Sequence, residues 1–96
     1  MNYEWDEAKA VANLVRHKVD FNSATEFEWE TAIEWETAIE TFDDRFDYEE
    51  DRWIAIGYID KKLHVLVYTI RSENIRIISL RKANKRERDF YEKNSK

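Results

Sequence analysis

The sequence of 96 residues contains no cysteine, no proline and a single glycine. Without cysteine, the chain cannot form disulfides or use thiolates to bind zinc or an iron–sulfur cluster. Its two histidines, His17 and His64, are far apart in the sequence, which argues against an all-histidine metal site within one chain. We therefore expect a protein with no metal site and no cofactor.

No apolar run approaches the roughly 20 residues of a membrane-spanning helix. The N-terminal segment, MNYEWDEAKA, carries acidic residues and no apolar run, so it does not resemble a signal peptide. We expect no contact with a membrane and a cytoplasmic location. Aromatic residues make up 15% of the chain, and this composition is typical of a folded protein. The length fits one domain, residues 1–96.

The net charge of −5 is unevenly distributed along the chain. Residues 71–96 hold nine Lys and Arg against four acids, whereas residues 1–70 hold seven against seventeen. Such asymmetry within one small domain suggests a basic face on an acidic body. A solvated charged helix would explain the same basic residues without a ligand. The acidic part would either confine RNA to one face or meet a basic partner.

Two helices are expected before the first strand. Asp6 can cap a helix over residues 7–17, and Asp20 can cap a shorter one over residues 21–27. Lys18 follows the first helix at a position that favours glycine, so we expect a slightly strained turn there. The first helix has apolar residues at helical spacing, which predict its buried face: Ala8, Val11, Ala12, Leu14 and Val15.

An identical hexapeptide, EWETAI, occupies residues 28–33 and again residues 34–39. Tryptophan, threonine and isoleucine alternate there with glutamate and alanine, which predicts a half-buried strand. In a helix, the two tryptophans would lie about 240° apart, and no apolar stripe would form. Two copies without any sequence drift indicate either a recent duplication or a deliberate one.

Three further strands, over residues 52–59, 63–70 and 75–80, are joined by short segments that suit antiparallel hairpins. Asn84 and Glu87 form a capping box, which begins a helix that ends near residue 93. The chain is thus predicted to be an α+β domain with two N-terminal helices, an antiparallel four-stranded sheet and a C-terminal helix.

Several motifs resemble those of the BrnT family, and the resemblance covers nearly the whole chain. They are residues Tyr3–Lys9, Asn13–Leu14 with His17–Phe21, Ile75–Ala83, and Arg86-Glu87-Arg88 followed by Tyr91. The family usually has glycine at the positions of Lys18 and Glu49, and alanine at that of Leu80. The repeated hexapeptide has no counterpart in the family.

The resemblance implies a ribonuclease toxin of a type II toxin–antitoxin system with a RelE-like fold. It further implies neutralisation by a BrnA-like antitoxin, with DNA contacted only through the antitoxin complex. Two alternatives remain. One is a catalytically inactive module that binds RNA or a partner on the same fold, and the other is a variant made to test how a fold accommodates a duplication.

Cleavage of RNA without a metal needs a base for the 2′-hydroxyl, an acid for the leaving oxygen and charge stabilisation at the phosphate. Arginine forks match phosphate oxygens, and Arg76, Arg81 and Lys82 are predicted to converge on one phosphate-sized site. His64 is the acid–base candidate, and Glu50 is expected to orient a base or to pair with the basic helix. For all of these residues, a solvated or ion-paired side chain is the alternative. The residues expected to bind RNA are Arg52, Lys85, Arg86 and Arg88.

The second copy of the hexapeptide adds about 20 Å of strand, which is more than the neighbours in a small sheet can pair. Either copy can occupy the same strand position, so the register is weakly specified. We expect one copy to take the first-strand position. The other is expected to project or to pair with a second molecule, which would give a homodimer.

Overall fold

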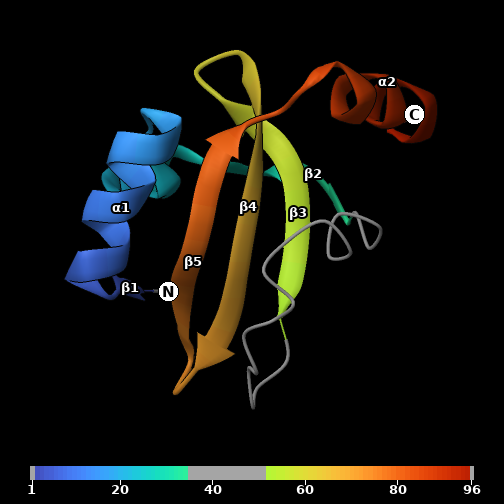
Figure 1. Ribbon diagram of the computed structural model, residues 1–96. Coiled ribbons are helices and arrows are strands. Elements are labelled where there is room, and N and C mark those ends of the chain that lie inside the picture. Colours follow the sequence, from blue (N-terminus) through green and yellow to red (C-terminus); the bar gives the residue numbers. More distant parts are fainter. Residues whose placement is uncertain (1, 35–51, 96) are drawn as a thin grey trace.

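The computed structural model describes residues 2–34 and 52–95, which form two helices, a 3-10 helix and five strands (Figure 1). In chain order, these elements are β1 (Tyr3–Trp5), α1 (Glu7–His17), the 3-10 helix η1 (Phe21–Glu26), β2 (Glu28–Glu34), β3 (Trp53–Ile59), β4 (Lys62–Arg71), β5 (Asn74–Lys82) and α2 (Lys85–Asn94).

The sheet has five strands in the order β1-β5-β4-β3-β2. Strands β2 to β5 pair antiparallel, whereas β1 pairs parallel with β5 through Tyr3 opposite Ile75 and Trp5 opposite Ile77. The α+β class is confirmed, but the expected antiparallel four-stranded sheet is wrong in its number of strands and in the direction of the added one. Strand β1 has three residues, too few to show an alternating pattern, and it becomes a strand only through its pairing with β5.

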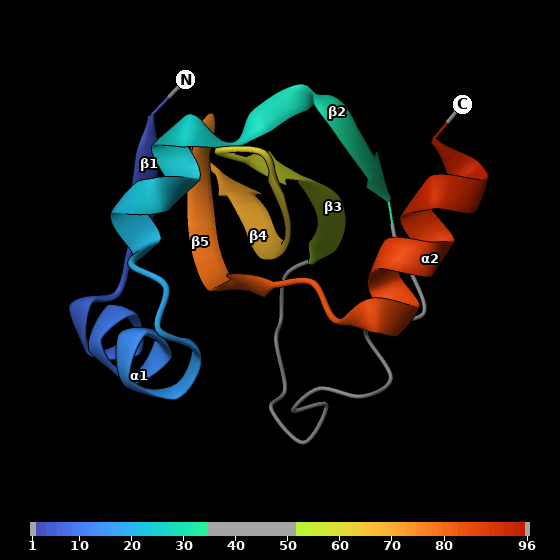
Figure 2. The ribbon, with the colours of Figure 1, turned by 90° about the horizontal axis from the view of Figure 1, so that it is seen from above.

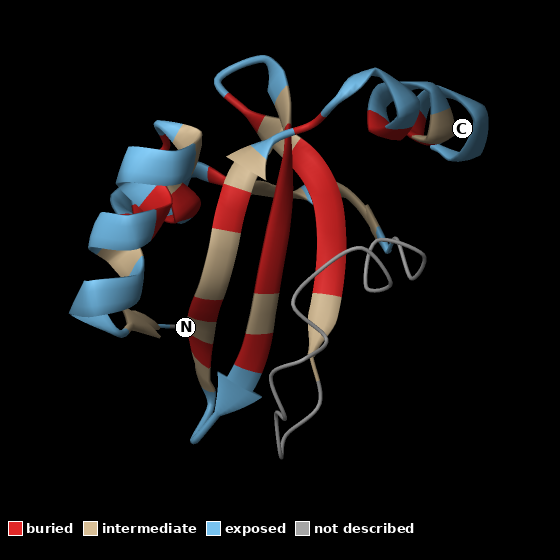
Figure 3. Ribbon diagram, viewed as in Figure 1, coloured by how far each residue is buried: buried red, intermediate tan, exposed pale blue. Residues whose placement is uncertain are grey.

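Each face of the sheet carries one apolar cluster. On the first face, which we call the α1 face, Phe21, Phe27, Leu66 and Leu80 are buried with residues of η1 and the strands. On the second, the α2 face, Ile56, Val65 and Val67 are buried with Tyr91 of α2. Figure 3 shows that buried residues concentrate in the three central strands. Viewed from above, α1 lies next to β1 and β5, and α2 lies at the other side of the molecule, near β2 (Figure 2).

Helix α1 has the predicted bounds, and Asp6 caps it by accepting hydrogen bonds from the backbone of Ala8 and Lys9. Its predicted buried face is wrong, because Val11 and Val15 are 61% and 68% exposed. The helix instead contacts the sheet through Asn13, which is buried. The Asn13 amide donates to the carbonyl oxygens of Val19 and Leu80, at 3.0 and 2.7 Å, and accepts from the backbone N–H of Leu80 at 3.2 Å.

The segment after α1 is shorter than a regular α-helix. Residues Phe21–Glu26 form the 3-10 helix η1, capped by the Asp20 side chain, in place of the expected second helix. The first hexapeptide copy then lies in β2, which pairs with β3. The first copy therefore forms the edge strand of the sheet next to β3. The second copy lies outside the described residues, apart from Glu34.

Candidate functional site

A β-bulge in β5 determines where its two arginines lie. Val67 of β4 pairs with Ser79 and the next residue, Tyr68, pairs with Ile77, so Ile78 is an extra residue on β5. Side chains alternate along a regular strand, so a spacing of five residues would place Arg76 and Arg81 on opposite faces. The extra residue in the bulge shifts this alternation by one position, so the two side chains lie on the same face. Both arginines therefore lie on the α2 face.

Arg81 is held by a bidentate ion pair with Glu87 of α2. Its Nη1 and Nη2 donate to the two carboxylate oxygens at 2.7 and 2.6 Å, and the Glu87 side chain is only 3% exposed. The same carboxylate accepts a hydrogen bond from the backbone N–H of Asn84, as the capping box predicts. This ion pair fixes the direction of Arg81 and joins the end of β5 to the first turn of α2.

Arg76 lies nearer the other end of β5 and pairs with Glu4 of β1. Its Nη1 donates to Glu4 at 2.9 Å, and the Asn74 amide donates to the other oxygen of the same carboxylate at 3.1 Å. The hydrogen bond from Asn74, followed by that from Arg76, lowers the pKa of the Glu4 carboxyl. At about 3.3 Å per residue, the Cα atoms of Arg76 and Arg81 are roughly 15 Å apart, and each arginine has its own acid. The two share a face and are not brought into one cluster.

Arg52 belongs to the same end of the sheet as Arg76. It directly precedes Trp53, which pairs with Tyr68, and continuation of this register places Arg52 beside Thr69. Thr69 is also the partner of Arg76 on the other side. Arg52 and Arg76 thus flank Thr69 on the α2 face. Glu50, also predicted as a catalytic residue, lies outside the described residues.

His64 and Lys82 are cross-strand partners on the α1 face. The His64 ring is buried, and its Nδ1 lies 2.9 Å from the carbonyl oxygen of Lys62. Burial lowers the pKa of His64 most, the Lys62 carbonyl raises it, and the charges of Lys82 and Lys62 lower it further. The register places His64 and Lys82 on the side opposite Arg76 and Arg81.

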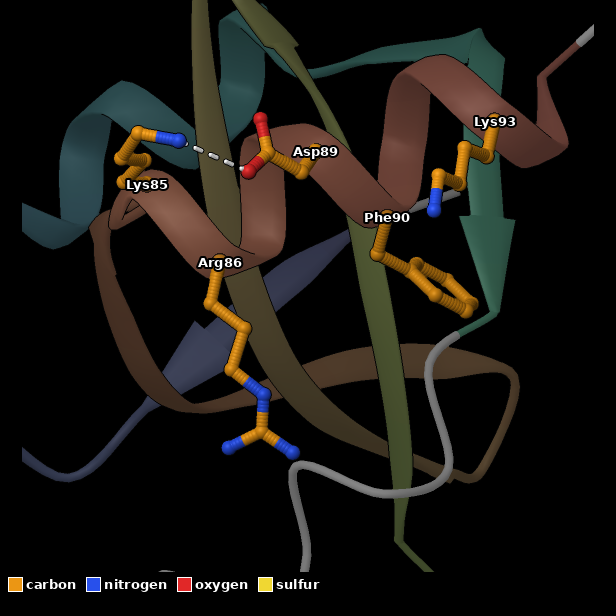
Figure 4. A pocket seen from close by; sticks show the side chains of 5 residues that line it. All are labelled: Lys85, Arg86, Asp89, Phe90 and Lys93. Atoms are coloured by element: carbon orange, nitrogen blue, oxygen red, sulfur yellow. Dashed lines mark hydrogen bonds and ion pairs between the residues drawn. The ribbon is translucent and has the colours of Figure 1, made fainter.

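The helix α2 supplies three of the predicted RNA-binding cations. A cavity of about 590 Å³ lies along it, lined by Lys85, Arg86, Asp89, Phe90 and Lys93 (Figure 4). Lys85 pairs with Asp89 at 3.0 Å, and in Figure 4 Arg86 points away from this pair, to the same side as Phe90. Arg88 is directed elsewhere, because its Nη1 donates to the carbonyl oxygen of Ala83 at 2.9 Å. Lys85 and Arg86 are thus the two predicted cations that line this cavity.

Within residues 2–34 and 52–95, no group of three or more histidine, aspartate or glutamate side chains could hold a metal ion. No helix in this part of the chain is long and apolar enough to cross a membrane.

Two acids that organise the arginines are not evident in the sequence. Glu87 was predicted only as a helix cap, although its position six residues after Arg81, across the turn into α2, is compatible with an ion pair. Glu4 is separated from Arg76 by 72 residues. No local pattern indicates that contact, because it depends on β1 joining the sheet.

Comparison with known proteins identifies the family. The model of the family "ribonuclease toxin, BrnT, of type II toxin–antitoxin system" matches residues 5–87. Among solved structures, the crystal structure of the Brucella abortus ribonuclease toxin BrnT is 26% identical, with a TM-score of 0.62, and the match covers 88% of this chain and 99% of that one. No curated protein matches the chain. Because the family model spans most of its length, the chain belongs to the BrnT family of ribonuclease toxins of type II toxin–antitoxin systems.

Proposed function

We propose that this chain is a metal-independent endoribonuclease that cleaves mRNA in the cytoplasm, on a RelE-like fold. The observation that carries the proposal is the match to the ribonuclease toxin family over residues 5–87, which include the whole of β5. A BrnA-like antitoxin neutralises the toxin in this proposal, and the toxin meets DNA only through the antitoxin complex.

The α2 face supplies the electrostatic part of the reaction. In the proposed step, the 2′-oxygen attacks the phosphorus, the bond from phosphorus to the 5′-oxygen breaks, and a 2′,3′-cyclic phosphate and a 5′-hydroxyl result. Negative charge increases on the phosphate oxygens in the transition state, and arginine stabilises it with paired N–H donors. Arg76 and Arg52 would act at one end of the face. At the other end, Arg81 would act with Lys85 and Arg86.

The proton transfers need a carboxylate or imidazole near the same phosphate. We assign the base to Glu50, which precedes Arg52 by two residues in the sequence. His64 is less suited to this role, because it is buried on the α1 face beside Lys82.

A catalytically inactive module that binds RNA or a partner is the second candidate. One observation favours it: Arg76 and Arg81 each already have a carboxylate partner, Glu4 and Glu87. A paired guanidinium offers a phosphate less net charge than an unpaired one. RNA would have to compete with Glu4 for Arg76.

The experiment that separates the two candidates is incubation of the purified chain with RNA in excess EDTA. We expect cleavage to continue and to leave 2′,3′-cyclic phosphate ends. Arg76→Gln is expected to reduce the rate by about 100-fold, as for the loss of a transition-state donor. Arg81→Lys, roughly 15 Å away along the same face, is expected to weaken RNA binding and to reduce the rate less. Arg16→Gln, which removes a cation from the exposed side of α1, is the matched control and keeps the rate. Circular dichroism checks that each variant is folded.

Three outcomes contradict the proposal. Activity that is lost on chelation and restored by Mg²⁺ or Mn²⁺ would indicate a metal-dependent reaction. Equal rates for wild type, Arg76→Gln and Arg81→Lys would remove the arginines from the mechanism. RNA binding without cleavage would favour the inactive module, and in that case Glu4→Gln should strengthen binding more than Glu30→Gln, because only Glu4 occupies Arg76.

A further inference from the structure

An aromatic cavity opens at one end of the α1 face, on the opposite side of the sheet from Arg76 and Arg81. It has a volume of about 360 Å³ and is lined by Tyr3, Trp29, Tyr68, Ile70 and Ile75. Its three aromatic rings come from β1, β2 and β4, three strands that are far apart in the sequence. We call this cavity the aromatic pocket. Its volume lies at the lower end of the range of small-ligand sites.

The rings of the aromatic pocket hold one another in place. The indole N–H of Trp29 donates to the Tyr3 hydroxyl at 2.7 Å, and Trp29 meets Tyr68 edge to face, with ring centroids 5.2 Å apart. Phe27 supports Trp29 from within the core, and Trp53 stacks on Tyr68. Side chains fixed in this way lose little conformational entropy when a ligand binds. The pocket is therefore preorganised.

The segment that supplies Trp29 to the pocket is acidic. Residues 19–34, which include η1 and β2, contain five acids and no lysine or arginine. Burial raises the pKa of the Tyr68 hydroxyl, and the charge of Glu34 raises it further, so the field of the Glu34 carboxylate reaches Tyr68. Arg71 follows Ile70 in the chain, but its charge acts on Glu4, which is on the other face.

Aromatic faces attract cations through their negative quadrupole, and nearby carboxylates add to the attraction. The same carboxylates would repel the phosphates of RNA. The pocket also has an aliphatic wall, Ile70 and Ile75, and Ile70 is 45% exposed. A long alkyl stem that ends in a cation suits this combination, and the planar guanidinium of arginine stacks on aromatic rings better than an ammonium does.

We propose that the aromatic pocket binds an arginine side chain of a partner protein. The alkyl stem would contact Ile70 and Ile75, and the guanidinium would lie against the rings of Trp29 and Tyr68, within the field of Glu34. This site is distinct from the arginines of the α2 face. It gives the acidic part of the chain a role as a surface for a basic protein.

The test uses two capped tripeptides, acetyl-Gly-Arg-Gly-amide and the uncharged isostere acetyl-Gly-citrulline-Gly-amide. Binding is followed by the indole N–H signal of Trp29 in ¹⁵N-labelled protein, which a Trp29→Phe variant assigns. We expect the arginine peptide to shift this signal saturably in the millimolar range and the citrulline peptide to bind about tenfold more weakly. Glu34→Gln should weaken arginine binding about two- to threefold, whereas Glu7→Gln, on the exposed side of α1, should leave it unchanged.

Ile70→Ser, at the exposed rim, keeps the Trp29 signal and should weaken arginine binding, because it removes part of the aliphatic wall. Equal binding of both peptides would show an apolar cleft without charge selectivity and would overturn the proposal. So would the absence of any shift, or a larger shift with adenosine than with the arginine peptide, which would indicate a nucleobase site. No RNA cleavage is measured, so the result is independent of the ribonuclease activity.

Discussion

Lys18 has backbone angles of φ 63° and ψ 26°, in the left-handed region that is strained for residues with a Cβ atom. Its backbone N–H closes helix α1 by donating to the carbonyl oxygen of Leu14 at 2.9 Å. Glycine takes this conformation without the steric cost. We expect Lys18→Gly to raise the free energy of unfolding by about 0.5–1 kcal/mol, measured by urea denaturation.

The matched control is Lys9→Gly, which makes the same substitution at an exposed position inside α1. There, glycine should lower the free energy of unfolding by about 1 kcal/mol, because the backbone is already helical. If both variants are destabilised equally, Lys18 is not strained, and the left-handed cap contributes nothing that glycine could improve.

His64 makes the stability of the fold depend on pH. The folded chain holds the pKa of His64 below its usual 6.5, mainly through burial, with Lys82 and Lys62 adding to the effect. Below pH 6.5 the unfolded state therefore binds more protons than the folded state, and the free energy of unfolding falls as the pH falls through this window. The stability that neutral His64 permits is fully present above pH 6.5. We expect His64→Gln to flatten this decline, measured as the urea midpoint between pH 5 and 8.

His17 is the second histidine with a lowered pKa, through burial and then the charges of Arg16 and Arg81. His17→Gln therefore separates the two contributions, and the larger change should come from the more deeply buried His64. An unchanged pH dependence in His64→Gln would contradict this account.

In addition to apolar packing, specific contacts hold helix α2 to the sheet. Besides the ion pair between Arg81 and Glu87, the Tyr91 hydroxyl donates to the carbonyl oxygen of Thr31 at 2.6 Å, and its ring packs edge to face on Tyr58. A buried ion pair is costly to break on one side, because the remaining charge has no partner. The position of α2, and so of Lys85 and Arg86, therefore depends on Glu87.

We expect Glu87→Gln to lower the free energy of unfolding by about 2–4 kcal/mol, because Arg81 then loses its charged partner while largely shielded from water. Asp89→Asn is the control on the same helix. It breaks the exposed pair with Lys85 and should cost less than about 0.5 kcal/mol. Urea denaturation measures both values. The double variant Arg81→Gln and Glu87→Gln should recover part of the loss, and equal costs for the two single variants would refute a structural role for Glu87.

Elements that are determined by neighbouring residues could be predicted from the sequence, whereas those that depend on distant contacts could not. The caps at Asp6, Asp20 and Asn84 are local, and the helix starts predicted from them are confirmed. The buried side of α1 was not predicted, because its apolar spacing does not reveal that the amide of Asn13 would be directed at the backbone of Leu80. The joining of β1 to the sheet and the bulge at Ile78 likewise arise from strand pairing, which a single sequence does not display.

The same limit applies to the candidate site. The alternation of residues in β5 indicated a cationic strand, but the bulge determines that Arg76 and Arg81 share a face, and the distant Glu4 determines the direction of Arg76. Of the basic residues near the C-terminus, Arg76 and Arg81 lie on the α2 face, and Lys85 and Arg86 lie on α2 itself. His64 and Lys82, however, lie on the other side of the sheet, because a strand sends neighbouring side chains to opposite faces.

The molecule as a whole separates two kinds of surface. The α2 face carries the arginines proposed to act on RNA, whereas η1 and β2 contribute acids and the aromatic pocket beside them. Two separate surfaces allow RNA and a basic protein to be bound without competing for the same residues. This arrangement explains how a chain with a net charge of −5 could still act on a polyanion.

A comparison of the chain with and without the second hexapeptide copy shows how this fold accommodates six additional residues. Removal of residues 34–39 leaves EWETAIE at positions 28–34, because Glu40 then follows Ile33 just as Glu34 does now. The sequence of β2 is thus the same with and without the second copy, and any difference between the two chains comes from the surplus alone. We predict that the surplus copy projects or pairs with a second molecule, since a strand edge with tryptophan, threonine and isoleucine on one side favours self-association. Sizing chromatography should then show a larger species for the full chain than for the shortened one, and tryptophan fluorescence should report a more exposed indole. Two monomers with equally buried tryptophans would mean that the domain absorbs the extra six residues.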